Sequence, residues 1–247
     1  MKRLSIWLCI ISGFFPSYLL WSQDKQEVKD SISVQKSERK RPISLRAGID
    51  LYHPVRGQVD DDFSGLELVG DLNLTDNLYV ALELGTEERK IQSEQLNFDA
   101  KGTYYKLGLD YNMYENWKGM DNQVYIGFRF ATSNHEFNVN NYLLFATDHF
   151  FEDVLTDSGY STGLRPDLSA NWAEFLAGIK VRLVQNLYLG FSLRLNVLIN
   201  ETVPEEFANL YIPGFNKVTD ENSFGIGFNY TLTYSLPFRF GKKSKAP

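Results

Sequence analysis

The sequence predicts an all-β protein, an antiparallel up-and-down transmembrane β-barrel of about eight strands, with ten as the alternative count. Three observations predict this fold. Apolar and polar residues alternate with a period of two in eight segments, a period that no helix has. Long and short connections between the segments mostly alternate along the chain, which is typical of bacterial barrels with long extracellular loops and short periplasmic turns. The N-terminus carries an export signal.

The export signal consists of Lys2 and Arg3 followed by an apolar run over 4–20. This run is too short to favour a spanning helix, and Ser22 offers a small-residue cleavage point, so we expect residues 1–22 to be a removed signal peptide. Residues 23–42 are polar without apolar periodicity, which predicts a disordered periplasmic leader. The only cysteine, Cys9, lies in the signal, so we expect no thiol chemistry in the exported chain.

The first five predicted strands alternate cleanly. Segment 43–52 reads ISLRAGIDLY, with its apolar residues at odd positions, and 65–72 (GLELVGDL) and 78–85 (LYVALELG) have theirs at even positions. Segment 105–113 (YKLGLDYNM) is apolar at odd positions, and 124–131 (VYIGFRFA) at even ones. Each therefore has one apolar and one polar face.

The last three predicted strands are longer. Segment 173–183 reads AEFLAGIKVRL, in which Leu176 breaks the alternation, and 187–199 reads LYLGFSLRLNVLI. Segment 224–240, FGIGFNYTLTYSLPFRF, has an apolar or aromatic residue at every even position. The predicted barrel therefore covers 43–240, and the polar residues 241–247 form a tail. The predicted connections are 54–62, 73–76, 86–100, 114–122, 133–170, 184–186 and 200–222.

A short motif, glycine followed by apolar, any and apolar residues, recurs in six strands with its glycine on the polar face. Such a repeat suits one sheet closed on itself. The glycines are Gly48, Gly108, Gly127, Gly178, Gly190 and Gly227.

Alternation alone does not say which face points inward, because a soluble lipocalin-like barrel has the same period with its apolar face inside. Volume decides: about forty mostly large apolar side chains would overfill a barrel of about eight strands, whereas the glycine-rich polar face fits. Charges of both signs on that face predict a cross-linked lumen network and a plugged barrel. The network residues are Arg46, Asp50, Glu67, Asp71, Glu83, Lys106, Asp110, Arg129, Glu174, Lys180, Arg182 and Arg194.

Aromatic residues on the apolar face predict the two interfacial girdles of a membrane barrel. They are Tyr111, Phe224, Tyr234, Phe238 and Phe240, together with Trp117 in a turn. The aromatic end at Phe240 is similar to the terminal-strand signal read by the barrel-insertion machinery, which we expect as a partner.

Three stretches resemble an uncharacterised outer-membrane β-barrel family of Bacteroidetes-type Gram-negative bacteria. They are LGLDYNMYENW from Leu107, AEFLAGIKVRLVQNLYLGFSLRLN from Ala173 and NLYIPGFNK from Asn209. The resemblance covers about 43–240 and implies a barrel fold and an outer-membrane location. That family has no established activity, so the resemblance transfers no functional residues.

The chemistry-bearing residues predict no enzyme, no cofactor and no metal site. His53, His135 and His149 fall at strand ends or in loops without metal-ligand spacing, and the acidic run 60–62 lacks the alternating ligands of a calcium loop. No phosphate-binding glycine loop or nucleophile elbow occurs. A Ser/His/Asp site assembled from loops stays open. With 25 basic residues, two of them in the signal, against 31 acidic ones, the charge has the wrong sign for nucleic acid.

The leading hypothesis is an exported, non-enzymatic outer-membrane barrel with a polar, plugged lumen and a structural or loop-mediated binding role. Its expected partners are outer-membrane lipids, lipopolysaccharide and an extracellular ligand or protein. The candidate loop binding surface is Tyr142, Phe150, Phe151, Tyr211, Pro213 and Phe215, and the alternative is that these loops cap the barrel mouth. A small-solute channel, a soluble periplasmic ligand-binding barrel and a lipid- or peptide-cleaving barrel are the other hypotheses.

Overall fold

The computed structural model describes residues 43–115, 120–144, 154–156, 162–204, 209–215 and 223–238, which all belong to one compact unit, Lys40–Pro247. Several predictions lie outside the described residues. They concern the signal peptide 1–22, the leader 23–42, the tail 241–247, and Trp117, His149, Phe150, Phe151 and Phe240.

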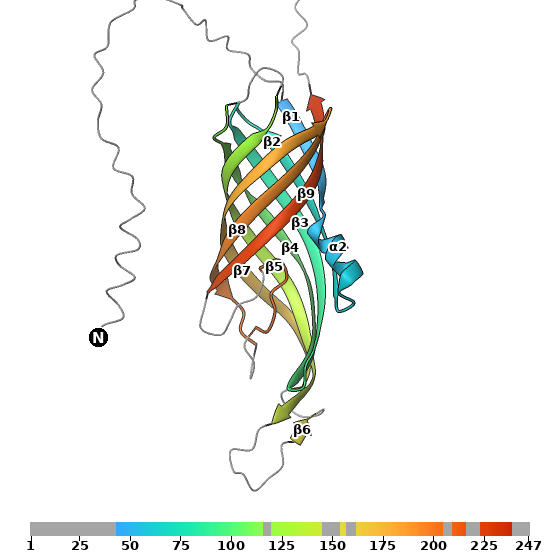
Figure 1. Cartoon of the computed structure of the whole chain (residues 1–247). Coiled ribbons are helices and arrows are strands. Elements are labelled where there is room, and N and C mark those ends of the chain that lie inside the picture. The colour runs from blue at the N-terminus through green and yellow to red at the C-terminus, as the bar shows by residue number, and fades with distance from the viewer. Residues whose placement is uncertain are drawn as a thin grey trace, which may run out of the picture. The chain divides into compact units, whose positions relative to one another are not determined.

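Eight strands form a closed ring in which each strand pairs antiparallel with its neighbours, and the last pairs with the first (Figure 1). This confirms the predicted all-β up-and-down barrel of eight strands. The ring strands are β1 (Ile43–Asp50), β2 (Phe63–Asn73), β3 (Leu78–Gln92), β4 (Leu96–Asn112), β5 (Gln123–Leu144), β7 (Gly163–Val184), β8 (Leu187–Glu201) and β9 (Phe224–Phe238).

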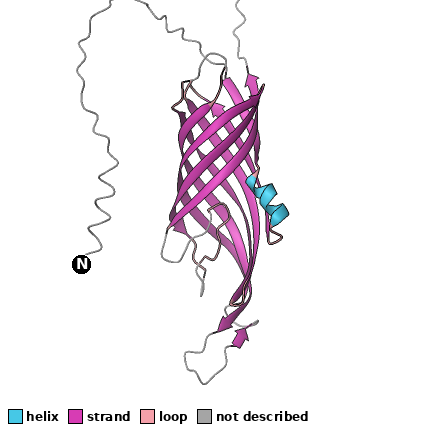
Figure 2. Ribbon diagram, in the orientation of Figure 1, coloured by secondary structure: helices cyan, strands magenta, loops and turns pink. Residues whose placement is uncertain are grey.

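Two short elements lie outside the ring. The helix α2 (Tyr52–Val59) follows β1, and β6 (Val154–Thr156) pairs with the far end of β5 (Figure 2). In the described part of the chain, no helix is long and apolar enough to cross a membrane.

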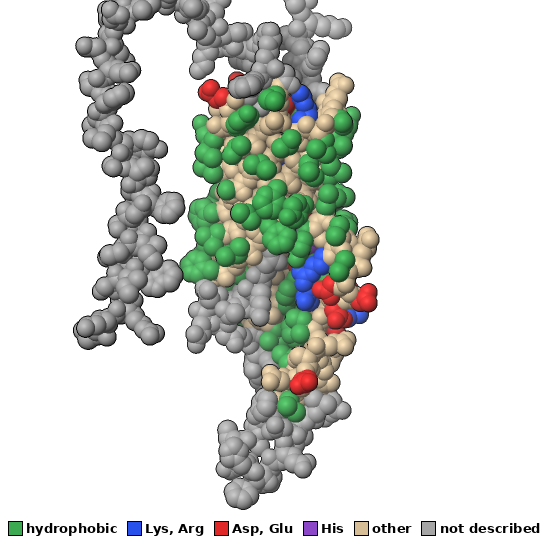
Figure 3. All heavy atoms as spheres, viewed as in Figure 1, with side chains coloured by type: hydrophobic (Ala, Val, Ile, Leu, Met, Phe, Trp, Pro, Cys, Tyr) green, Lys and Arg blue, Asp and Glu red, His purple; other side chains and the backbone are tan. Residues whose placement is uncertain are grey.

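The apolar face of the strands points outward, as the volume argument predicted. Leu107 is 58% exposed, Leu193 54% and Ile226 78%, whereas the polar face lines the interior. Figure 3 shows hydrophobic side chains spread over the barrel, with charged ones gathered at its two ends. Leu176, which broke the alternation, is buried in the lumen row between Glu174 and Gly178, so β7 keeps its register.

Gly178, one of the recurrent glycines, makes room for a large side chain inside the barrel. A Cβ atom at Gly178 would lie 2.6 Å from Cζ of Tyr125 and 2.8 Å from the carbonyl oxygen of Phe191. The absence of a side chain at Gly178 therefore leaves space for the Tyr125 ring in the narrow lumen.

We expect Gly178→Ala to lower the free energy of unfolding by about 1–3 kcal/mol, because its methyl group overpacks the lumen. Gly70→Ala is the control, since its Cβ would meet no atom closer than 3.5 Å. Urea titration of both variants, followed by gel migration of the folded band, measures the difference. Equal stability of the two variants would contradict the packing argument.

The prediction of a loop over 86–100 is wrong. β3 and β4 continue as one hairpin that turns at 93–95, so the third connection is short and the fourth, 113–122, is longer. The reason is an inversion of the pattern beyond Leu84. Outward positions become polar, as at Thr86, and inward positions become apolar, as at Phe98. β5 and β7 are extended in the same way, so much of the predicted connection 133–170 is strand.

Candidate functional site

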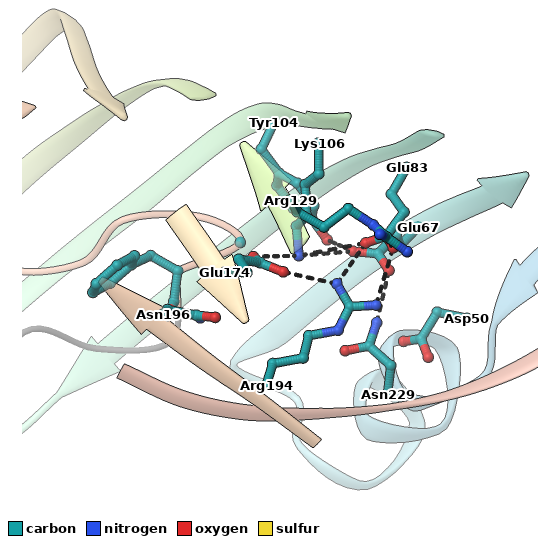
Figure 4. A network of polar contacts seen from close by, with 12 residues as sticks. Asp50, Glu67, Glu83, Tyr104, Lys106, Arg129, Glu174, Arg194, Asn196 and Asn229 are labelled. Atoms are coloured by element: carbon teal, nitrogen blue, oxygen red, sulfur yellow. Dashed lines mark hydrogen bonds and ion pairs between the residues drawn. The ribbon is translucent and has the colours of Figure 1, made fainter. Parts of the chain in front are cut away.

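The centre of the lumen is a network of three glutamates and three cations (Figure 4). Arg194 links two of the acids, with its Nη1 2.6 Å from Oε2 of Glu83 and 2.9 Å from Oε2 of Glu174. Nζ of Lys106 lies 3.2 Å from Oε1 of Glu174. Since these residues come from β3, β4, β7 and β8, the network joins strands that are not neighbours. Its other members are Glu67 on β2 and Arg129 on β5.

A second group of charges lies closer to the strand ends that are joined by the turns 74–77 and 185–186. Arg129 donates to both oxygens of Asp110, at 2.7 and 3.0 Å, and Arg46 and Lys180 both bind Asp71. The structure thus buries eleven of the twelve predicted lumen residues. Asp50 lies in the barrel mouth, and the ten others lie inside the barrel. Arg182 is exposed near the end of β7, so it lies outside the lumen.

Side chains occupy most of the lumen at the level of these charges. The cavity among these charges, lined by Asp71, Glu83 and Lys180 among others, has a volume of about 20 Å³. That is room for about one water molecule. The described residues therefore leave no open pore through this level of the barrel.

The barrel mouth is closed by residues 209–215, which we call the plug. Tyr211, Pro213 and Phe215, predicted to form a binding surface, are buried instead, and Phe215 packs edge-on against Trp172 with ring centroids 5.6 Å apart. They fill the mouth because its walls there are apolar: Tyr104, Ala131 and Ala170 join Trp172 around Ile212 and Phe215. The position of residues 209–215 agrees with the alternative prediction, in which the loop caps the barrel mouth. Tyr142 lies near the end of β5, partly buried against a neighbouring apolar cluster.

A histidine between two carboxylates borders the plug. His53, on α2, lies with Nδ1 2.6 Å from Oδ2 of Asp50 and Nε2 2.8 Å from Oε1 of Glu87. Burial lowers the pKa of His53, but the hydrogen bonds to Asp50 and Glu87 outweigh burial and raise it to about 9. With a pKa of about 9, the imidazolium form has an N–H on each nitrogen to donate, one to Asp50 and one to Glu87.

The charge balance fits this protonated state. The described residues include seven buried carboxylates against five buried Lys and Arg side chains. A buried charge needs a partner, so the positive His53 reduces the excess of carboxylates.

Stability should therefore fall at alkaline pH. Because the folded pKa of about 9 lies above the ordinary 6.5, the contribution of His53 is complete below about pH 6.5 and lost as pH rises through about 9. We expect the wild type to lose up to about 3 kcal/mol more than His53→Gln between about pH 6 and about pH 10. Urea titrations across this range measure the difference, and parallel pH profiles would refute the assignment.

The remaining histidine and acidic residues that the structure describes make local contacts. His135 is buried with its Nε2 3.4 Å from Oδ1 of Asn209, and burial lowers its pKa. Asp60 pairs with Arg56 and Arg89, at 3.5 and 3.2 Å. Among the described residues, no group of three His, Cys, Asp or Glu side chains is placed to hold a metal ion.

Sequence reasoning missed Glu87, Tyr104 and Trp172 as parts of the mouth. Glu87 fell in the predicted loop 86–100, and Tyr104 and Trp172 preceded predicted strands by one residue. The alternation that continues beyond the predicted strand ends, with apolar residues on the inward face, was the signal that could have found Tyr104 and Trp172.

Comparisons with known proteins identify a family but no activity. No curated protein matches the chain. The solved structure of Ail, the attachment invasion locus protein of Yersinia pestis, is similar at a TM-score of 0.36 and 10% sequence identity, covering 80% of this chain and 98% of that chain. The family model described as "Domain of unknown function (DUF6048)" matches residues 1–242. The chain therefore belongs to the DUF6048 family.

Proposed function

We propose that the protein is an exported outer-membrane β-barrel with a plugged, non-conducting lumen and no enzymatic role, which anchors an extracellular β-sheet for binding. The observation that carries this proposal is the sidedness of the wall, apolar outside and charged inside. In water, an apolar exterior over a whole barrel would aggregate, whereas lipid solvates it.

The edges of the apolar surface support a membrane belt. The outward side chains change from apolar or aromatic to polar along each strand. The change falls between Leu84 and Thr86 on β3, between Tyr105 and Thr103 on β4 and between Phe130 and Thr132 on β5. In the strand register Leu84 lies beside Tyr105, and Tyr105 beside Thr132, so these changes follow one line around the barrel. Exposed aromatics stand near both edges: Tyr111 and Tyr234 at one, Tyr105 and Phe224 at the other.

The sheet beyond this line supports the binding role. The extended parts of β3, β4, β5 and β7 carry polar outer side chains over a small apolar cluster that includes Phe98 and Phe137. Two hollows of about 620 and 520 Å³ cross its outer face, lined by Lys101 and Glu136 among others. Their place just above the belt fits contact with lipid head groups, including the sugars and phosphates of lipopolysaccharide, or with an extracellular partner.

Two measurements test the proposal. Fractionation should place the protein in the detergent-soluble membrane fraction, with heat-modifiable gel migration, and release by osmotic shock would instead favour a soluble periplasmic barrel. In planar bilayers we expect no stable channel conductance, because charged side chains fill the lumen. Large, steady conductance would contradict the plugged barrel and favour the small-solute channel.

A further inference from the structure

The barrel wall is incomplete on one side. β1 ends at Asp50, and its ladder with β2 covers only Leu68 to Leu72, so residues 63–67 of β2 pair with β3 alone. On the other side, the pairing of β1 with β9 ends at Thr231, so residues 224–230 of β9 do not pair with β1. The half of the wall nearer the mouth therefore has a gap between β2 and β9.

The helix α2 fills this gap. The Tyr52 ring packs edge-on against Phe228 of β9, with centroids 5.0 Å apart, and the Arg56 guanidinium lies 4.2 Å from the centroid of Phe63 on β2. His53 points inward, and Gly65 makes room for it, because a Cβ atom there would lie 2.9 Å from Cδ2 of His53. Side-chain contacts, rather than a complete strand ladder, seal this part of the wall.

One carboxylate ties the helix to the plug. Oε1 of Glu87 binds His53, while Oε2 accepts hydrogen bonds from the Tyr211 hydroxyl at 2.7 Å and from the Gly214 backbone N–H at 3.0 Å. Asp50 completes the link to the wall, since its Oδ1 accepts the backbone N–H of Tyr230 at 2.9 Å. Loss of the hydrogen bonds between Glu87 and either the helix or the plug therefore weakens the attachment of both α2 and the plug.

The side chains packed behind the helix and the plug are of two kinds. Toward the gap lie the carboxylates of Asp50, Glu67 and Glu87, which are bound here by donors of the chain itself. Those donors include His53, Asn229 and Tyr211. Deeper in, the walls around Ile212 and Phe215 are apolar, with Trp172 at their centre. A molecule suited to both parts has a cationic or hydrogen-bond-donating head and an apolar tail.

We propose that α2 and the plug form a lateral gate, through which an amphipathic molecule with a cationic or donor head group passes between the membrane and the barrel mouth. The gate rests on the proposed membrane location. It adds a route and a ligand class to that function. Because side chains fill the lumen below the mouth, a molecule in the mouth would leave sideways through the wall rather than through a central pore.

Trp172 reports on this gate. In a full chain carrying Trp7→Phe, Trp21→Phe and Trp117→Phe it is the only tryptophan, and it lies fully buried behind Phe215. After refolding into phosphatidylcholine vesicles, its fluorescence is quenched with three probes: aqueous acrylamide, a bromine-tipped long-chain amine and the matching long-chain carboxylic acid. The amine is expected to quench Trp172 more strongly than the acid.

Tyr211→Phe keeps the ring and removes one hydrogen bond to Glu87. We expect it to raise the quenching constants of acrylamide and the amine about tenfold, as expected for losing a hydrogen bond to a charged group. Tyr105→Phe is the matched control, since that hydroxyl faces outward and accepts from Asn134. Tyr52→Ala removes the contact with Phe228 of β9, together with the ring contact to His53 and the hydrogen bond from Arg56. It deletes no hydrogen-bond partner of Glu87, so it should raise quenching by the amine more than quenching by acrylamide.

The outcomes separate the parts of the proposal. Unchanged quenching in Tyr211→Phe overturns the link through Glu87, a rise for acrylamide alone overturns the lateral route, and equal quenching by amine and acid overturns the head-group class. Each variant must keep heat-modifiable migration, and Tyr211→Phe and Tyr52→Ala test the gate independently if one fails to fold. A chain that does not insert into vesicles overturns the proposed function and the gate with it, whereas an inserted chain that fails the quenching tests overturns the gate alone.

Discussion

Arg194→Met is expected to lower the free energy of unfolding by about 3–5 kcal/mol, because it leaves buried carboxylates without their partner. Arg194 donates to both oxygens of Glu83 and to Glu174, and all three side chains are buried. The methionine side chain nearly keeps the volume, so the loss reports on charge rather than on a cavity. Urea titration followed by heat-modifiable migration measures it.

Two controls make this expectation specific. Lys101→Ala removes an exposed ion pair, 3.1 Å from Glu136, and should cost under about 1 kcal/mol. Adding Glu83→Gln to Arg194→Met removes one of the stranded charges and should recover part of the loss, since neutralising both partners is less costly than stranding one. A double variant as unstable as the single one would show that Arg194 acts through packing.

The barrel could be predicted from sequence because one physical rule holds in the belt. In the proposed membrane belt, lipid outside and a narrow lumen inside require strict alternation, so 187–199 and 224–240 indicated both their strands and which face points inward. The same rule placed Glu83, Glu174 and Arg194 in the lumen together. Their exact partners depend on the strand register and on side-chain reach across the barrel, which a single sequence does not encode locally.

The mouth could not be predicted because the type of residue on each face changes there. Beyond Leu84 the outward residues of β3 are polar, as expected where water replaces lipid outside the proposed membrane belt. A reading that expects apolar residues on the outward face all along the strand therefore takes this segment for a loop. Tyr211 and Phe215 were assigned to a surface for a related reason. A Pro-Gly turn with apolar neighbours reads as an exposed loop tip, whereas Gly214, with a φ of 81°, turns the plug back into the mouth.

Leu109→Arg tests the lipid-facing assignment most directly. Leu109 is 47% exposed on the outer face of β4 and lies between Tyr105 and Tyr111, which mark the two edges of the belt. An arginine near the middle of a membrane barrel costs about 2–4 kcal/mol, because its charge must leave water or pull water and head groups inward. We expect that loss in vesicles, measured by urea titration.

Thr103→Arg is the matched control, on the same face of the same strand but beyond the belt. There the guanidinium stays in water or among head groups, so the cost should be within about 0.5 kcal/mol. The contrast between two positions six residues apart isolates the solvent outside the barrel, since strand, face and substituent are shared. If water surrounded both positions, the two arginines would be tolerated alike, and the membrane belt would have to be abandoned.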